Sequence, residues 1–314
     1  MIILIKHPRV SKQQGGQWLP RNETRALYNN VTIPEPYNHT YAYSRLPSYL
    51  HTSKTGAEKR FYERYRSPEH YQEAMKNIYA LITQVDNACK EIVDELKKQD
   101  IYNNTMIIFT TDNGMFHGAH GLAGKWYPYQ ESIRVPLIVY DPRMPLDKRG
   151  AVDDSFTLNV DLAETILGAA GLKPHKRMQG RDMSDLYLPK IEIGKPVLER
   201  KPWRDEFFYE FTIFDENSIP SSNALVRKRW KFIHWYTKNG FQLFDLGSDP
   251  LELYDVKDDP ANADIVKEMK ARLFELRDGL KEPDIGCKFD NYDWIQPILE
   301  EPAESINATI AGKG

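Results

Sequence analysis

The most chemically suggestive stretch of the sequence is the loop that begins at Asp112 and ends at Lys125. Asp112 and Asn113 directly follow residues 105–111, an apolar and β-branched run typical of a strand covered on both faces. A carboxylate beside a carboxamide offers two hard oxygen ligands, which suit Ca²⁺ or Mg²⁺ better than zinc. In open α/β sheets, ligands bind beyond the carboxyl ends of strands, where these two side chains are expected. The pair is therefore a candidate metal site.

A cationic side chain closes the same loop. Glycines recur from Gly114 to Gly124, and their conformational freedom lets the backbone double back toward the start of the loop. Lys125 follows them directly, so its ammonium group is placed to contact an anion that a metal at Asp112 would also hold. The loop is thus a candidate site for a cation and an oxyanion together.

Other interpretations of these residues stay open at this point. Asp-Asn-Gly is also one of the commonest turn signatures, and a turn needs no metal. His117 and His120 are three positions apart and could form a zinc pair, although no third ligand has a helpful spacing. Lys125 precedes Trp126, and such a lysine can simply lie over the aromatic ring at the surface.

The segments around this loop indicate an α/β fold. A Ser-Pro pair at residues 67–68 starts a pattern of apolar residues spaced three and four apart, which predicts one long amphipathic helix as far as residue 96. Residues 135–140 form a second buried-strand pattern, and residues 159–170 form another helical pattern. Helix and strand patterns that alternate in this way are typical of a sheet with helices packed on it.

The two ends of the chain differ from this middle part. Residues 11–66 show neither a helical nor a strand period, and we expect a long surface excursion there. Aromatic-rich strand patterns and a Lys-Asn-Gly turn after residue 195 predict a small antiparallel sheet, which a helix follows. The expected strands are 206–214, 223–235 and 241–245, and the expected helix is 260–281. The expected domains are a partial α/β domain (1–194), an antiparallel-sheet subdomain with a helix (195–300) and a loose tail (301–314).

Composition excludes several classes of protein. The 314 residues carry 42 Lys and Arg against 45 Asp and Glu, and a net charge of −3 argues against a nucleic acid or an anionic membrane held by bulk charge. At 41% hydrophobic and 12% aromatic residues, the chain is typical of a soluble globular protein. No apolar run approaches the roughly 20 residues of a membrane span, and no signal peptide is visible. Cys89 and Cys287 are too few for a disulfide framework.

Longer strings extend the motifs of the loop. They include Thr-Thr-Asp-Asn-Gly (110–114), Gly-Ala-His-Gly-Leu-Ala-Gly-Lys-Trp (118–126) and Glu-Ser-Ile-Arg-Val-Pro (131–136), and they continue at 161–171, 178–181, 226–233 and 243–253. In this order and at these separations, the strings resemble the type I sulfatase family of the alkaline-phosphatase-like superfamily. The resemblance implies an alkaline-phosphatase-like sheet with flanking helices, without its N-terminal part, and a small C-terminal antiparallel sheet with a helix.

The resemblance assigns roles to residues already singled out. It implies that Asp112 and Asn113 bind a divalent cation, usually calcium with Mg²⁺ as the alternative, and that Lys125 contacts the sulfate group. His120 would contact the substrate beside the cleft, although Ala119 stands where the family often has an acidic residue. A cation and an ammonium group suit this substrate, because a sulfate ester carries negative charge on its non-bridging oxygens as the S–O bond breaks.

The sequence departs from the family at the nucleophile and at one histidine. The family's nucleophile is a formylglycine made from the first residue of Cys/Ser-x-Pro-x-Arg, and this chain has no such motif. The paired N-terminal aspartates that complete the family's metal site are also missing. The first ten residues resemble a strand that leads to the family's catalytic histidine. This register puts Arg9 in that histidine's place, and His7, two positions earlier, is the candidate catalytic residue.

We therefore expect an N-terminally incomplete sulfatase-like chain, corresponding to the last half to two-thirds of a sulfatase. The expected reaction is hydrolysis of a carbohydrate or aryl sulfate ester, and the expected partner is a sulfated small molecule or glycan. A phosphate or phosphonate monoester hydrolase and a non-catalytic protein that binds sulfated glycans stay open as alternatives. The family resemblance implies an extracellular, periplasmic or lysosome-like location. An incomplete sheet would leave an exposed edge, which predicts self-association.

Overall fold

The computed structural model describes residues 18–39, 43–51, 56–189, 202–212, 219–236 and 238–280. The chain divides into two compact units, 1–273 and 274–314, and the described part of the second unit is the end of the last helix. The candidate His7, the expected domain boundary at 194/195 and the expected tail at 301–314 all lie outside the described residues.

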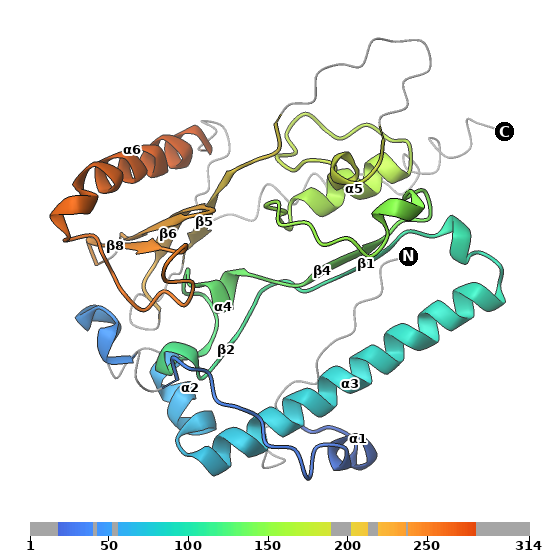
Figure 1. Ribbon diagram of the computed structural model, residues 1–314, viewed down its shortest axis with the longest axis horizontal. Coiled ribbons are helices and arrows are strands. Elements are labelled where there is room, and N and C mark those ends of the chain that lie inside the picture. The colour runs from blue at the N-terminus through green and yellow to red at the C-terminus, as the bar shows by residue number, and fades with distance from the viewer. Residues whose placement is uncertain are drawn as a thin grey trace, which may run out of the picture. The chain divides into compact units, whose positions relative to one another are not determined.

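The long helix that the sequence predicts is α3 (Pro68–Lys98), drawn in Figure 1. Ser67 caps it, because the Ser67 hydroxyl accepts a hydrogen bond from the backbone N–H of His70. The N-terminal half of α3 packs against α1 (Asn22–Ala26) and α2 (Gly56–Tyr65), whereas the C-terminal half is only partly buried. The buried residues of α3 are Tyr71, Ala74, Met75, Ile78, Ala80 and Leu81.

The segment before α3 contains more structure than expected. It includes α1, α2 and two single 3₁₀ turns (Tyr43–Arg45 and Ser48–Leu50), so the prediction of a surface excursion over 11–66 is wrong for the described residues of that range. The helical period is weak in this part of the sequence because the apolar positions are few and many of them are aromatic, as at Phe61 and Tyr65. The buried apolar residues of the segment are Ile33, Leu46, Leu50, Phe61 and Tyr65.

The strand before the candidate site is confirmed, but its surroundings differ from the prediction. β1 (Ile107–Thr110) pairs antiparallel with β4 (Leu137–Tyr140), and within the described ranges these two strands form a sheet of their own. All four residues of β1 are only partly buried, and Ile138 on β4 is 63% exposed. The expectation of a strand covered on both faces is therefore wrong for the described residues, because all four residues of β1 are only partly buried and β1 has β4 as its one described strand neighbour.

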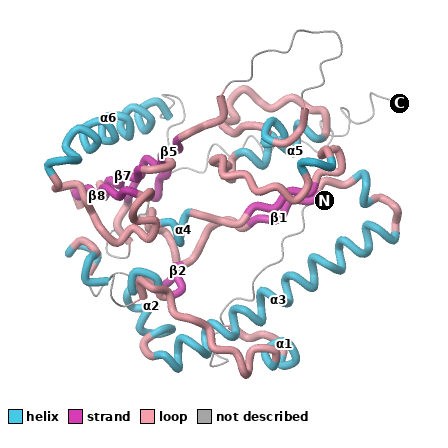
Figure 2. Tube along the Cα trace, in the orientation of Figure 1, coloured by secondary structure: helices cyan, strands magenta, loops and turns pink. Residues whose placement is uncertain are grey.

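Loops make up most of the chain between β1 and α4 (Gln130–Ile133), as Figure 2 shows. A short hairpin within this segment pairs β2 (Phe116–His117) with β3 (Ala123–Gly124). Gly118, Gly121 and Gly124 all have positive φ angles, which let the backbone turn sharply. The hairpin returns the chain to the end of β1, as the glycine pattern predicts.

The C-terminal part forms the predicted antiparallel sheet and helix. Four strands lie in sequence order, with every neighbouring pair antiparallel. The predicted strand 223–235 is two strands, because the chain turns at Lys228-Arg229, where neither Gly, Pro nor Asn marks a turn. The strands are β5 (Glu206–Phe211), β6 (Ser222–Arg227), β7 (Trp230–Trp235) and β8 (Gly240–Asp245), and α6 (Ala263–Leu280) follows.

A mainly aromatic core joins the antiparallel sheet to the loop between β3 and α4. Trp235 on β7 and Phe244 on β8 pack in one cluster with Tyr127 and Tyr129 from that loop. The helix predicted over residues 159–170 is α5 (Asp161–Ala169). Within the described ranges, no helix is both long enough and apolar enough to cross a membrane.

Candidate functional site

Three of the predicted site residues lie together at the end of β1. The Nζ atom of Lys125 donates a hydrogen bond of 2.6 Å to Oδ1 of Asn113 and lies 3.8 Å from Oδ2 of Asp112. The Asp112 side chain is 84% exposed, so its carboxylate is available to a ligand. The loop thus brings two oxygen ligands and one ammonium group to one point, which is the arrangement that the sequence suggested.

Backbone contacts fix Asn113 and its neighbours in place. The N–H of Gly114 donates to the carbonyl of Ser132, and a Cβ at Gly114 would lie only 2.2 Å from the carbonyl oxygen of Glu131. Only glycine fits there. The Asn159 side chain donates to the carbonyl of Asp112, which holds the other side of the turn. The Asp-Asn-Gly segment therefore forms a turn that also presents the two candidate metal ligands. The turn interpretation and the metal interpretation are compatible.

The donors fit a hard divalent cation in type but not in number. Asp112 and Asn113 supply carboxylate and amide oxygens, whereas Ca²⁺ takes six to eight oxygen ligands. Across the described residues, no group of three or more His, Cys, Asp or Glu side chains is placed to hold a metal ion. Lys125 also occupies Oδ1 of Asn113. Further ligands would be needed to complete a calcium site here.

Trp126 has a backbone conformation that is rare for a side chain of its size. Its φ angle is 89°, in the region that favours glycine. The N–H of Trp126 donates to the Ser132 hydroxyl at 2.9 Å, and its carbonyl accepts a 3.0 Å hydrogen bond from the Tyr209 hydroxyl. These two bonds hold the strained residue, and with it the neighbouring Lys125. No local sequence pattern points to Tyr209, which lies on β5 of the C-terminal sheet.

His120 belongs to a separate, buried cluster. Its side chain is 1% exposed, and its ring stacks on Tyr129 with 4.7 Å between the ring centres. Its Nε2 atom lies 3.4 Å from Oε2 of Glu131. In the part of the chain that the structure describes, His120 makes no hydrogen bond or ion pair with Asp112, Asn113 or Lys125. A substrate contact by His120 stays a prediction.

Glu131 is a residue that sequence reasoning did not single out. Burial by itself raises the pKa of its carboxyl, but hydrogen bonding and charge from His120, together with the amide of Asn38, lower the pKa below its usual value. Glu131, which lies on α4, is therefore a carboxylate, and it connects α4 to the turn that contains His120. The available signal was its place at the start of the Glu-Ser-Ile-Arg-Val-Pro string.

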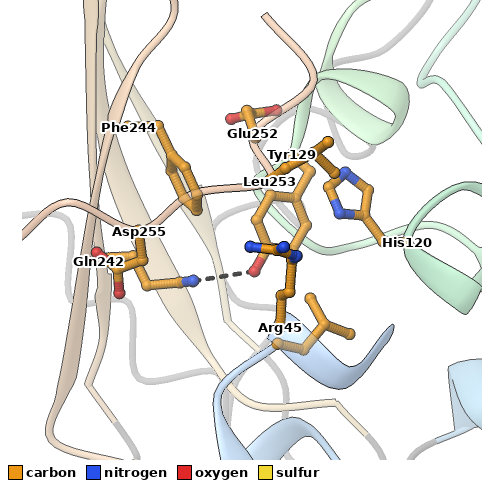
Figure 3. Close-up of a pocket in the computed structure, with 9 residues that line it drawn as sticks. Arg45, His120, Tyr129, Gln242, Phe244, Glu252, Leu253 and Asp255 are labelled. Carbon is orange, nitrogen blue, oxygen red and sulfur yellow. Dashed lines mark hydrogen bonds between the residues drawn. The ribbon is translucent and has the colours of Figure 1, made fainter. Parts of the chain in front are cut away.

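A small pocket lies beside His120 and Tyr129 (Figure 3). Its volume of about 10 Å³ is room for about one water molecule, so it cannot hold a sugar. The Tyr129 hydroxyl donates to Oε1 of Gln242 at 2.9 Å in its wall. The lining residues are Arg45, Leu46, His120, Tyr129, Gln242, Phe244, Glu252, Leu253 and Asp255.

The two histidines of the loop have different partners. Nδ1 of His117 lies 3.2 Å from the Tyr65 hydroxyl, whereas His120 lies against Tyr129 and Glu131. Each ring is engaged with its own neighbours, and this arrangement gives the zinc-pair interpretation no support.

Comparisons with known proteins match this site loop and the C-terminal sheet. A family model described as N-sulphoglucosamine sulphohydrolase, C-terminal, matches residues 118–279, and one described as sulfatase matches residues 37–172. An N-acetylglucosamine-6-O-sulfatase of Bacteroides thetaiotaomicron is 26% identical over 279 residues, which are 83% of this chain and 48% of that protein. The chain spans less than half the length of the curated relatives it matches, with shares of 48%, 39% and 41%.

Two solved structures share the fold. One is a complex of a protein with its substrate D-glucosamine-2-N,6-O-disulfate, with a TM-score of 0.68 and 24% identity over 85% of this chain and 64% of that chain. The other is the phosphonate monoester hydrolase of Agrobacterium radiobacter, with a TM-score of 0.59 and 27% identity over 68% of this chain and 43% of that chain. The predicted α/β fold with its C-terminal antiparallel sheet is confirmed.

Proposed function

We propose a function from one premise, which is that the chain belongs to the type I sulfatase family of alkaline-phosphatase-like proteins. The protein that contains this chain hydrolyses sulfate esters, and these residues supply the side of the site that binds the oxyanion. The observation that carries the proposal is the meeting of Lys125 with Asn113 at 2.6 Å and with Asp112 at 3.8 Å.

The proposed chemistry follows from the charges at this point. The ammonium group of Lys125 neutralises negative charge on the non-bridging sulfate oxygens, which grows as the S–O bond breaks. A divalent cation, when bound, supplies further positive charge to the same oxygens, and Asp112 and Asn113 would be two of its ligands. The formylglycine motif is not in this chain. We therefore propose sulfate binding for these 314 residues, and turnover only for a polypeptide that includes the motif.

The proposed substrate is a sulfated glucosamine-type sugar. The matched relative is named for N-acetylglucosamine 6-O-sulfate, and one solved structure with this fold holds a disulfated glucosamine. The extracellular, periplasmic or lysosome-like location that the resemblance implies is part of the same proposal.

The test is binding of glucosamine 6-sulfate to the 314-residue chain, measured by isothermal titration calorimetry. Lys125→Ala should weaken binding at least about tenfold, because a charge-assisted contact to sulfate is lost. Lys148→Ala removes the same charge from an exposed surface position and should leave the affinity unchanged. Equal affinity of Lys125→Ala and the unchanged chain would contradict the proposal.

Two rival functions need their own comparison. A phosphate or phosphonate monoester hydrolase shares this fold, as the Agrobacterium radiobacter structure illustrates. Rates on matched aryl sulfate and aryl phosphate esters, measured on a polypeptide that includes the nucleophile motif, separate the two hydrolases. Binding of the sulfated sugar by that same polypeptide without any turnover would instead favour a glycan-binding protein.

A further inference from the structure

The indole ring of Trp126 carries a second cationic group besides Lys125. The guanidinium carbon of Arg60 lies 4.7 Å from the ring centre, and Nζ of Lys125 lies 5.9 Å from it. Arg60 comes from α2, which packs against β3. A Cβ at Gly124 would lie 3.7 Å from Cδ and from Nη1 of Arg60, so the arginine lies directly against the strand that precedes Lys125. Cations from two separate elements therefore meet at one aromatic ring.

The guanidinium group of Arg60 is not fully hydrogen-bonded among the described residues. Its Nη1 atom is buried and has no hydrogen-bond partner among them, and the same holds for Nε of Arg64, one helical turn further on. Burial lowers the pKa of Arg64, and the charge of Arg60 lowers it further, whereas Tyr65 and the exposed Glu63 raise it. α2 thus presents two neighbouring guanidinium groups, each with one buried nitrogen that has no acceptor among the described residues.

This arrangement has a cost that a ligand would remove. Like charges four residues apart on a helix destabilise it, and a buried N–H group without an acceptor loses the hydrogen bond that water gave it. An anion placed between such cations gains charge-assisted hydrogen bonds and relieves their repulsion. The Trp126 backbone is held by hydrogen bonds with the Ser132 and Tyr209 hydroxyls, and both Arg60 and Lys125 lie against the Trp126 ring.

We propose that Arg60 binds a second anionic group of the substrate while Lys125 binds the sulfate that is to be cleaved. The substrate is then a sugar unit with two anionic groups, and Arg60 selects it over a singly sulfated sugar. This inference rests on the proposed function, because it takes Lys125 as the sulfate contact.

The test compares two probes, glucosamine 6-sulfate and glucosamine 2-N,6-O-disulfate, by isothermal titration calorimetry on the 314-residue chain. Arg60→Gln should lower the preference for the disulfated sugar about tenfold, because one charge-assisted contact is lost. Arg60→Lys keeps the charge and should retain most of the preference. Lys59→Gln removes the same charge from an exposed position on the same helix and should leave the preference unchanged.

A second measurement does not depend on any variant. On the unchanged chain, added salt should weaken binding of the disulfated sugar more steeply than binding of the monosulfated one, since one more ion pair forms. Equal salt dependence for the two sugars would overturn the inference. So would an Arg60→Gln variant that unfolds at the same temperature as the unchanged chain and keeps the full preference.

The outcomes separate this inference from the proposed function. If Lys125→Ala weakens both sugars while Arg60→Gln leaves their ratio unchanged, the proposed function stands and the role of Arg60 fails. If Arg60→Gln weakens both sugars equally, Arg60 supports the fold of the loop and does not choose the substrate. If the unchanged chain binds neither sugar, both proposals fail together.

Discussion

His117 is held neutral by its surroundings. Loss of water contact lowers the pKa of the imidazole to about 4, and the positive charge of Arg64 contributes in the same direction. Its Nδ1 atom lies 3.2 Å from the Tyr65 hydroxyl. Protonation of His117 would put a second positive charge beside Arg64. The hairpin that returns the chain to Lys125 therefore depends on a neutral ring.

This pKa gives stability a defined pH dependence. The imidazole of His117 binds a proton near pH 6.5 in the unfolded chain but only near pH 4 in the folded chain. The stability that the neutral ring contributes is therefore complete above about pH 6.5 and is lost as the pH falls toward 4. We expect the free energy of unfolding in urea to drop by up to about 3 kcal/mol over that window through this residue.

The controls are two other histidine substitutions. His117→Gln should flatten the pH dependence, although buried His39, whose pKa is also lowered by burial, leaves a residual slope. His175→Gln changes an exposed histidine and should leave the slope intact. A His117→Gln variant with the full slope of the unchanged chain would show that the ring is not the titrating group.

At the scale of elements, a buried ion pair ties the site loop to the antiparallel sheet. Lys231 on β7 and Glu252, after β8, form the pair with both side chains fully buried. Nζ of Lys231 also donates to the carbonyl of Pro128 at 3.0 Å, and Oε2 of Glu252 accepts from the N–H of Gln130 at 2.6 Å. Burial lowers the pKa of Lys231 and raises that of Glu252, and their pairing opposes both effects.

Breaking this pair from one side should be costly. Lys231→Met leaves the Glu252 carboxylate buried without its partner, and we expect a loss of about 3–5 kcal/mol in the free energy of unfolding. The double variant Lys231→Met, Glu252→Gln removes both charges and keeps an acceptor for the N–H of Gln130. It should recover much of that loss in urea titrations. Equal losses in the single and double variants would mean that the charges are not coupled.

The elements that the sequence predicts well are those with a strong local signal. The cap at Ser67 and the apolar spacing after it fixed α3, and the Asp-Asn-Gly string placed the site after β1. Arg60 could not be assigned, because nothing in the local pattern of α2 says that it packs on β3. The positive φ of Trp126 was equally hidden, since it is held by a hydrogen bond that the Trp126 N–H donates to Ser132 and by one that its carbonyl accepts from Tyr209.

At the scale of the whole molecule, apolar surface remains open among the described residues. Ile138 on β4 is 63% exposed and Ile82 on α3 is 58% exposed. The β1–β4 pair also has open strand edges within the described ranges. Apolar faces and free strand edges of this kind favour association between copies of a chain.

We therefore expect the 314-residue chain to self-associate. Sedimentation velocity should show an average mass that rises with protein concentration. Ile138→Lys places a charge on the open face of the β1–β4 pair and should reduce the association, whereas Leu146→Lys changes an apolar residue that is 80% exposed outside any strand and should have little effect. A single monomeric species at every concentration would contradict this expectation.

The left-handed backbone conformation of Trp126 costs stability, whereas its side chain belongs to the proposed binding site. Glycine adopts that conformation at no steric cost, so a laboratory selection for heat resistance alone would have a reason to replace the tryptophan. Each such replacement would discard the aromatic surface over which Arg60 and Lys125 lie. Selection that preserved the proposed binding of two anionic groups would have to retain the strained residue, and a more heat-resistant protein would then have to gain its stability elsewhere.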